Sequence, residues 1–166
     1  MEGSGGVEQG RPAPRRRDGG PHDQGSASAK ILIVEDDPDV VAVTQMLLER
    51  RGYRIVTAPS APEGKRKVEG ERPDLILLDI MLPLGTEGFD LVWSLRKHPD
   101  PVLRDTPIVV MSAIHRTTEL RLYPEEADPE YAPGEFLPVQ AFLDKPVIFD
   151  ELARVVESVL AGRRRQ

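Results

Sequence analysis

The sequence contains no cysteine, few aromatic residues (5%) and no long apolar run. Without cysteine, disulfide bonds and thiolate metal sites are excluded. Because no run of about 18 apolar residues occurs, we expect no membrane-spanning helix. The N-terminus also lacks the charged start and apolar stretch of a secretory signal. These absences lead us to expect a cytoplasmic protein that does not act in a membrane.

An excess of positive charge is also missing. The chain has 28 acidic and 22 basic residues, which gives a formal net charge of −6. A dominant nucleic-acid surface requires a basic field, so we predict no DNA-binding domain. Arginines do cluster at positions 15–17 and 163–165. We interpret both clusters as solvated tail charges rather than as docking patches for an acidic partner.

Large apolar residues are almost absent from positions 1–29, which are rich in glycine, serine, proline and arginine. Such a segment cannot bury enough surface to offset the entropy lost on ordering. We therefore predict a disordered N-terminal leader over 1–29, one folded domain over 30–161 and a basic tail over 162–166.

Short apolar runs alternate with helical patterns in the folded part. We expect strands over 31–34, 53–58, 75–78, 108–111 and 141–144. We expect helices over 38–51, 60–69, 89–97 and 148–159. The apolar face of the last helix comprises Ile148, Phe149, Leu152, Val155, Val156 and Val159. Continuous apolar strands that alternate with helices predict an α/β fold with a parallel sheet covered on both faces.

The segment 123–138 breaks this alternation. It contains four prolines and several acidic residues, and prolines at that density forbid a continuous helix. We therefore predict irregular structure where a fourth crossover helix would be expected.

Polar residues follow four of the expected strands. Glu35 and Asp36 follow the first strand, Asp79 the third, Ser112 the fourth and Lys145 the fifth. In an open parallel sheet, ligands bind beyond the carboxyl ends of the strands. Each residue alone has an ordinary explanation as a helix cap or a turn residue. Their joint occurrence at the same end of four strands predicts a shared site.

The chemistry of such a site follows from its charges. Clustered carboxylates repel one another, and either a divalent cation or bound protons relieves the repulsion. Ligands that are all oxygens suit Mg²⁺. Lys145 and Ser112 can then bind phosphoryl oxygens, with Asp79 as the nucleophile of a phosphoryl transfer.

Four segments, 31–38, 73–83, 109–113 and 142–146, resemble the receiver domain of bacterial response regulators. The resemblance extends over residues 30–161. It implies a flavodoxin-like (βα)5 fold with a doubly wound, five-stranded parallel sheet. It also implies a regulator, not a metabolic enzyme, that accepts a phosphoryl group from a sensor histidine kinase or a histidine phosphotransfer protein.

The resemblance implies a role for each site residue. Asp79 is the phospho-acceptor, and Asp36 and Asp79 bind Mg²⁺ directly. Glu35 acts on the ion through water, and the Met81 backbone carbonyl completes the ligand set. Ser112 and Phe142 are the switch residues, and Lys145 contacts the phosphoryl group. The resemblance further implies a cis Lys145–Pro146 bond.

Two departures from the family pattern keep alternatives open. The gap between Ser112 and Lys145 is longer than usual, and Phe142 lacks the hydroxyl of a tyrosine. We expect a stand-alone phosphorylation switch that acts on an unknown downstream protein. One alternative is an interaction module that is never phosphorylated. Another is a Mg²⁺-dependent phosphohydrolase, which would require an acid at the position of Met81.

Overall fold

The computed structural model describes residues 28–83, 85–113 and 137–163. Five strands lie in one parallel sheet in the order β2-β1-β3-β4-β5. The strands are β1 (Lys30–Val34), β2 (Arg54–Ala58), β3 (Leu75–Asp79), β4 (Ile108–Ser112) and β5 (Ala141–Asp144). The helices are α1 (Pro38–Glu49), α2 (Ala61–Glu71), α3 (Glu87–Arg96), α4 (Pro101–Arg104) and α5 (Phe149–Arg163). The predicted flavodoxin-like architecture is confirmed.

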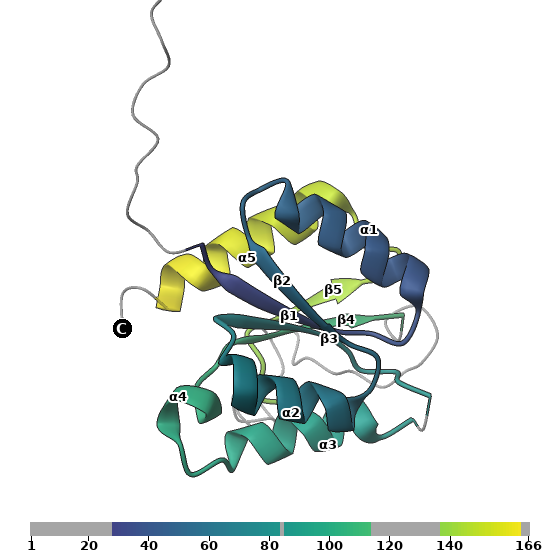
Figure 1. Ribbon diagram of the computed structural model, residues 1–166. Helices are drawn as coiled ribbons and strands as arrows, with labels where there is room; N and C mark the ends of the chain where they lie inside the picture. Colours follow the sequence, from purple (N-terminus) through teal and green to yellow (C-terminus); the bar gives the residue numbers. More distant parts are fainter. Residues whose placement is uncertain (1–27, 84, 114–136, 164–166) are drawn as a thin grey trace, which may run out of the picture.

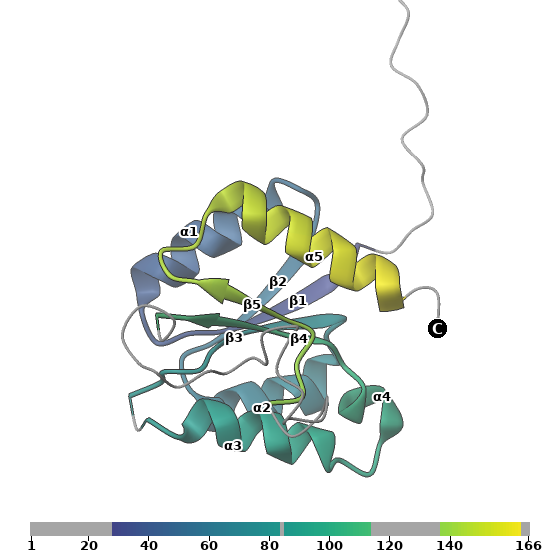
Figure 2. The same cartoon turned by 180° about the vertical axis from the view of Figure 1, so that it is seen from behind.

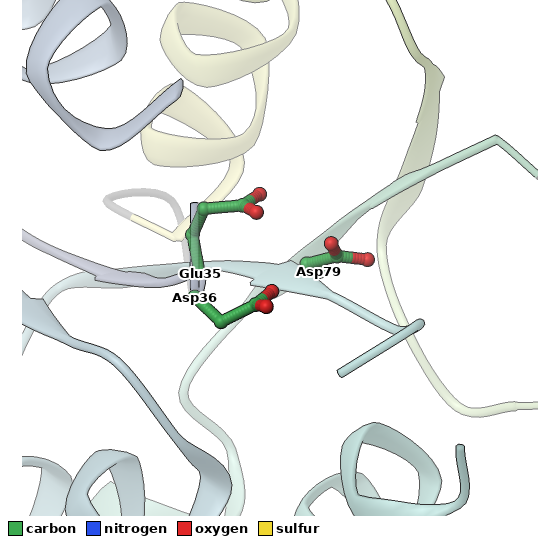
Figure 3. A group of neighbouring side chains, drawn as sticks. All are labelled: Glu35, Asp36 and Asp79. Atoms are coloured by element: carbon green, nitrogen blue, oxygen red, sulfur yellow. The ribbon is translucent and has the colours of Figure 1, made fainter. Parts of the chain in front are cut away.

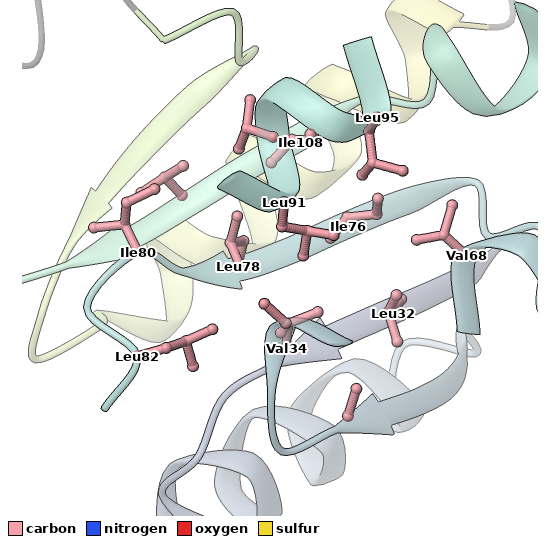
Figure 4. Packing of buried hydrophobic residues seen from close by; sticks show 14 of the residues in the cluster. Leu32, Val34, Val68, Ile76, Leu78, Ile80, Leu82, Leu91, Leu95 and Ile108 are labelled. Carbon is pink, nitrogen blue, oxygen red and sulfur yellow. The ribbon is translucent and has the colours of Figure 1, made fainter. Parts of the chain in front are cut away.

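Helices cover the sheet on both faces (Figures 1 and 2). Helices α1 and α5 lie on one face, and α2, α3 and α4 lie on the other. Successive strand residues point to opposite faces, so each strand supplies both cores. Figure 4 shows the core beneath α2 and α3, to which Leu32, Ile76 and Ile108 contribute. Every residue of β3 and β4 is buried, which explains why these strands are apolar at nearly every position.

The start of α1 illustrates how local sequence sets the helix boundaries. Asp37 precedes the helix, and its carboxylate accepts hydrogen bonds from the amides of Asp39 (2.9 Å) and Val40 (3.4 Å). Pro38 occupies the first helical position, where its missing N–H costs nothing. The expected start of this helix at position 38 is confirmed, and the cap and the proline direct the chain away from the sheet immediately after β1.

The short helix α4 was not predicted. It begins in the same way as α1, because the Asp100 carboxylate accepts a hydrogen bond from the Val102 amide at 2.9 Å and Pro101 comes first. The Asp-Pro pair was the available signal. The longer segment 123–138, predicted to be irregular, lies almost entirely outside the described residues, as do positions 1–27 of the expected leader and positions 164–166 of the expected tail.

The last helix differs from the sequence prediction at both ends. Ile148 and Phe149 were placed on its apolar face, but they are 64% and 48% exposed. At the other end, α5 continues to Arg163, which was expected among the solvated tail charges. The Arg163 guanidinium instead donates hydrogen bonds to the carbonyl oxygens of Asp74 (2.7 Å) and Pro73 (3.3 Å). Arg163 thus anchors the end of α5 to the loop before β3.

The chain that enters β5 is anchored by Arg96, the last residue of α3. Its guanidinium donates to the carbonyl oxygens of Pro138 (2.8 Å), Thr106 (2.9 Å) and Arg104 (2.6 Å). Hydrogen bonds from a charged donor contribute about 1.5–3 kcal/mol each when they are well formed. This contact fixes the start of β5, the strand that leads to Lys145.

Among the helices that the structure describes, none combines the length and the apolar character needed to cross a membrane.

Candidate functional site

The strands that were expected to carry the site are paired in a register that places their carboxyl ends side by side. Asp79, the last residue of β3, lies opposite Met111 in β4, and Ser112 lies opposite Asp144 in β5. The Lys145 amide donates a hydrogen bond to the Ser112 carbonyl at 2.9 Å, which extends the pairing by one residue. All of these residues therefore lie at the carboxyl edge of the sheet.

Three carboxylates converge at this edge. Glu35 and Asp79 are buried, with 2% and 5% exposure, and Asp36 is exposed. One oxygen from each carboxylate lies within 4.8 Å of the others. Figure 3 shows Glu35 and Asp36 extending from the end of β1 toward the side on which Asp79 lies. Because Asp37 caps α1, only the first two of the three consecutive acids take part in the cluster.

Lys145 connects two of these carboxylates. Its ammonium Nζ lies 2.6 Å from Asp79 Oδ2 and 2.7 Å from Glu35 Oε2. The side chain reaches past the end of β4, since Lys145 follows β5 whereas Asp79 ends β3. One cation is thus placed between two buried anions.

The second oxygen of Asp79 is also bound. The Met81 amide donates a hydrogen bond to Asp79 Oδ1 at 2.8 Å. Aspartate side chains commonly accept such a bond from the amide two residues ahead. With one oxygen held by a backbone amide and the other by an ammonium, the orientation of the Asp79 carboxylate is fixed.

Burial and the neighbouring charges shift two pKa values in the site. Burial raises the pKa of Glu35 above its ordinary value. The Lys145 hydrogen bond opposes this shift and the Asp79 carboxylate adds to it. For Lys145, burial alone would lower the pKa, but the hydrogen bonds to Asp79 and Glu35 outweigh it and raise the pKa. The Lys145 ammonium is therefore charged at neutral pH, whereas burial and the Asp79 carboxylate oppose ionisation of Glu35.

The carboxylates fit a hard divalent cation. Glu35, Asp36 and Asp79 offer only oxygen atoms, and the chain contains no cysteine that would favour a softer metal. A small cation that retains several waters can be bound by a few carboxylates, as Mg²⁺ commonly is. The residues present thus meet the chemical requirements of a Mg²⁺ site.

Comparison with known proteins agrees with this geometry. The model of the response regulator receiver domain matches residues 31–127, more than half of the chain. The chain belongs to the response regulator receiver domain family. It is 30% identical over 134 residues to the protein PilH of Pseudomonas aeruginosa, an alignment that covers 81% of this receiver and 99% of PilH.

Two further matches differ in extent. The receiver is 44% identical over 68 residues to the alkaline phosphatase synthesis transcriptional regulatory protein PhoP of Bacillus subtilis. That match covers 41% of this chain and only 28% of PhoP. A solved CheY-like receiver domain from Methanospirillum hungatei is similar in structure, with a TM-score of 0.64 and 27% identity. It covers 84% of this chain and 98% of that one. The receiver fold is therefore shared over nearly the whole of a receiver domain, but over a small part of PhoP.

The remaining predicted site residues lie at or near the same edge. Ser112 is buried at the end of β4, with 1% exposure. Phe142 lies in β5 and packs, partly buried, against the core beneath α2 and α3. The Lys145–Pro146 bond is cis, as the family resemblance implied. The switching roles of Ser112 and Phe142, and the metal contact of the Met81 carbonyl, stay predictions.

Two contacts of the site were not predicted. The sequence indicated Glu35 as a metal-facing acid, but its ion pair with Lys145 depends on the strand order, which the sequence does not reveal. The bond from the Met81 amide to Asp79 had a signal, because an aspartate after a strand favours such a turn.

We predict opposite effects of Glu35→Gln on stability and on metal binding. A carboxyl with a raised folded-state pKa contributes stability that is fully present below its unfolded pKa, near 4.5, and is lost as pH rises through the folded pKa. The neutral glutamine avoids this loss. In a chelating buffer, thermal unfolding should show the variant to be more stable than the wild type at neutral pH, with a difference that shrinks toward acid pH.

Stabilisation by Mg²⁺ should be weaker in Glu35→Gln than in the wild type. Removing one of the three carboxylates weakens the electrostatic attraction for Mg²⁺, so the rise in melting temperature on adding Mg²⁺ should be smaller than in the wild type. A variant that is less stable than the wild type in chelator at neutral pH would contradict the raised pKa of Glu35.

Proposed function

We propose that this receiver is a phosphorylation-dependent switch that accepts a phosphoryl group on Asp79, with Mg²⁺ bound by Glu35, Asp36 and Asp79. One observation carries the proposal: Lys145 Nζ lies 2.6 Å from Asp79 Oδ2, beside the three carboxylates. An anionic oxygen with an ammonium at its side is suited to attack phosphorus, since phosphoryl transfer depends on positioning and on neutralised charge.

Transfer of the phosphoryl group from a phosphohistidine to Asp79 needs no oxidant, reductant or further co-substrate. A carboxylate oxygen of Asp79 forms a new P–O bond, and the P–N bond to a phosphohistidine donor breaks. The electron pair of that bond goes to the imidazole, which is protonated by solvent. Glu35, Asp36 and Asp79 would hold Mg²⁺, which would supply positive charge to offset the negative charge of the transferring phosphoryl group. The Met81 amide and Lys145 hold the Asp79 carboxylate in one orientation before the reaction.

Phosphorylation would change the partners of Lys145. In the structure described here, Lys145 bridges Asp79 and Glu35. A phosphoryl group on Asp79 adds charge and oxygen acceptors, and we propose that the ammonium and the Ser112 hydroxyl then bind those oxygens. The resulting shift at the ends of β4 and β5 biases Phe142 and the neighbouring surface, which a protein partner reads.

The proposal is tested by labelling the full chain with acetyl phosphate and measuring its intact mass. We expect the addition of one phosphoryl group in the presence of Mg²⁺ and none when the metal is chelated. A parallel NMR titration with beryllofluoride should move the amide signals around Asp79 and Lys145. If the chain binds Mg²⁺ but shows neither response, a receiver that works without phosphorylation is the better account.

A groove beside the site provides a place for the phosphodonor protein. It has a volume of about 350 Å³ and lies between α1 and the start of α5, with Val40, Val43 and Phe149 on its walls. Lys145 also lines it, so a protein bound there is adjacent to Asp79. The exposed side chains of Val43 (42%) and Phe149 (48%) offer an apolar contact. We propose that a helix bearing the phosphohistidine binds in this groove.

Substituting Val43 separates donor docking from chemistry. Val43→Glu introduces a charge into the groove and should reduce the labelling rate from a phosphorylated histidine kinase or phosphotransfer protein by about tenfold or more. Labelling by acetyl phosphate, which needs no docking surface, should be unchanged. The matched control is Val102→Glu on α4, where the valine is similarly exposed at 49%. If Val43→Glu lowered the labelling rate equally with the protein donor and with acetyl phosphate, the substitution would have damaged the phosphorylation site and not the docking surface.

A further inference from the structure

Gly88 lies in the first turn of α3, where this helix contacts the loop after β3. The residue is buried. A Cβ added at Gly88 would lie 2.7 Å from both the Cα and the carbonyl oxygen of Ile80, and 3.0 Å from its carbonyl carbon. Real Cβ atoms do not come that close to other atoms, and the atoms in the way are backbone, which cannot rotate aside as a side chain can. Any larger residue at position 88 must therefore displace the Ile80 backbone or α3.

The Ile80 carbonyl belongs to the peptide unit that holds the phospho-acceptor. A peptide unit is planar, so the Ile80 carbonyl and the Met81 N–H move together. That N–H donates the 2.8 Å hydrogen bond to Asp79 Oδ1. A displacement of the carbonyl by a Cβ at position 88 is thus transmitted through one rigid unit to the Asp79 carboxylate.

We propose that Gly88 is a positioning residue for Asp79: its missing side chain lets α3 pack against the Ile80–Met81 peptide, and this packing sets the orientation of the acceptor carboxylate. The inference rests on the proposed function, because it assigns Gly88 a part in phosphorylation at Asp79. It adds a requirement from α3, which contributes no side chain to the cluster of Glu35, Asp36 and Asp79.

Two other glycines provide matched controls. At Gly64 in α2, an added Cβ would meet side-chain atoms of Val34 at 3.0 and 3.3 Å and of Leu91 at 3.4 Å. These contacts are with side chains and not with the backbone of the acceptor loop, so Gly64→Ala crowds the same helical layer without a direct clash at Ile80. At Gly70, also in α2, nothing lies within 4 Å of an added Cβ. Gly70→Ala therefore reports the effect of alanine in a helix with no clash.

The experiment measures the rate of labelling by acetyl phosphate for Gly88→Ala, Gly64→Ala, Gly70→Ala and the wild type. All four proteins are assayed in saturating Mg²⁺, at a temperature well below their unfolding midpoints. We expect the rate to fall about 10- to 100-fold in Gly88→Ala, because a displacement of about 1 Å can cost about 100-fold. The other two variants should keep the wild-type rate, even if Gly64→Ala loses thermal stability.

A second readout follows the Met81 amide by NMR. Its hydrogen bond to Asp79 should give a downfield proton signal that moves upfield in Gly88→Ala and stays in place in Gly64→Ala. A folded Gly88→Ala protein with the wild-type labelling rate and an unmoved Met81 signal would overturn the proposal. If the wild type takes no phosphoryl group, the proposed function fails, but the Met81 signal still decides whether Gly88 positions the acceptor loop.

If Gly88→Ala does not fold, the proposal can still be tested by an NMR titration of the wild-type protein with Mg²⁺. Addition of Mg²⁺ should shift the amide signals of Met81 and Gly88 together and leave Gly70 unchanged. A Gly88 signal that stays fixed while Met81 moves would show that α3 is not coupled to the acceptor loop, and the inference would be wrong.

Discussion

Replacement of Asp79 with asparagine is expected to reduce phosphoryl incorporation from acetyl phosphate by about 1000-fold or more. Asparagine keeps the shape of the side chain but has no anionic oxygen to attack phosphorus, and removal of a nucleophile usually has an effect of this size. Because Lys145 still has Glu35 as a partner at 2.7 Å, we expect the fold to be retained. Intact mass spectrometry measures the incorporation, and circular dichroism measures the fold.

The matched control for Asp79→Asn is Asp37→Asn. Asp37 lies close to the site in sequence, but its carboxylate caps α1, a role that asparagine fills equally well. This control should be labelled at the wild-type rate. Full labelling of Asp79→Asn would place the phosphoryl group on another residue, and the proposed acceptor would be wrong.

The fold was largely predictable because its strands carry an unmistakable pattern. Residues 75–78 and 108–111 are apolar without interruption, and the structure buries all of them. A run of this kind in an alternating α/β sequence has few alternatives to a central parallel strand. Once the strands are parallel, their polar last residues must share one edge. The meeting of Asp79 with Glu35 and Asp36 follows from that geometry.

The features that escaped prediction depend on neighbours that are distant in the sequence. Ile148 and Phe149 fit an apolar helix face, yet both are exposed: Ile148 precedes α5, and Phe149 lines the groove at the start of that helix. Arg163 looks like a tail charge, but two carbonyl oxygens of the loop before β3 lie within its reach. The sequence did not indicate a role for Gly88, because only the structure shows that α3 packs against the Ile80 backbone at this residue. Local patterns carry no information about such contacts.

Replacement of Lys145 with methionine is expected to change metal binding and phosphorylation in opposite directions. The ammonium lies 2.6 Å from Asp79 and 2.7 Å from Glu35, so it competes with Mg²⁺ for the same oxygens and repels the ion. Without it, Mg²⁺ should bind about tenfold more tightly, which is a modest electrostatic effect for charges at such distances. Isothermal titration with Mg²⁺ measures this affinity.

The labelling rate of Lys145→Met should nevertheless fall on the order of 100-fold, even with Mg²⁺ saturating, because a preorganised charge that stabilises the transferring group is worth about that much. Without metal, the variant leaves Glu35 and Asp79 unpaired, so the free energy of unfolding at neutral pH should fall by about 2 kcal/mol. This is less than for a fully buried pair, because Lys145 is 21% exposed.

Lys145→Arg keeps the charge and should therefore keep the weak Mg²⁺ affinity of the wild type, while its bulkier, planar group restores only part of the rate. Lys145→Met removes the charge, whereas Lys145→Arg keeps the charge and changes the shape of the side chain. If only Lys145→Met binds Mg²⁺ more tightly, the change in Mg²⁺ affinity is caused by loss of the positive charge. If Lys145→Met instead bound Mg²⁺ more weakly and was labelled at the wild-type rate, Lys145 would be a structural partner of the acids and not part of the phosphoryl site.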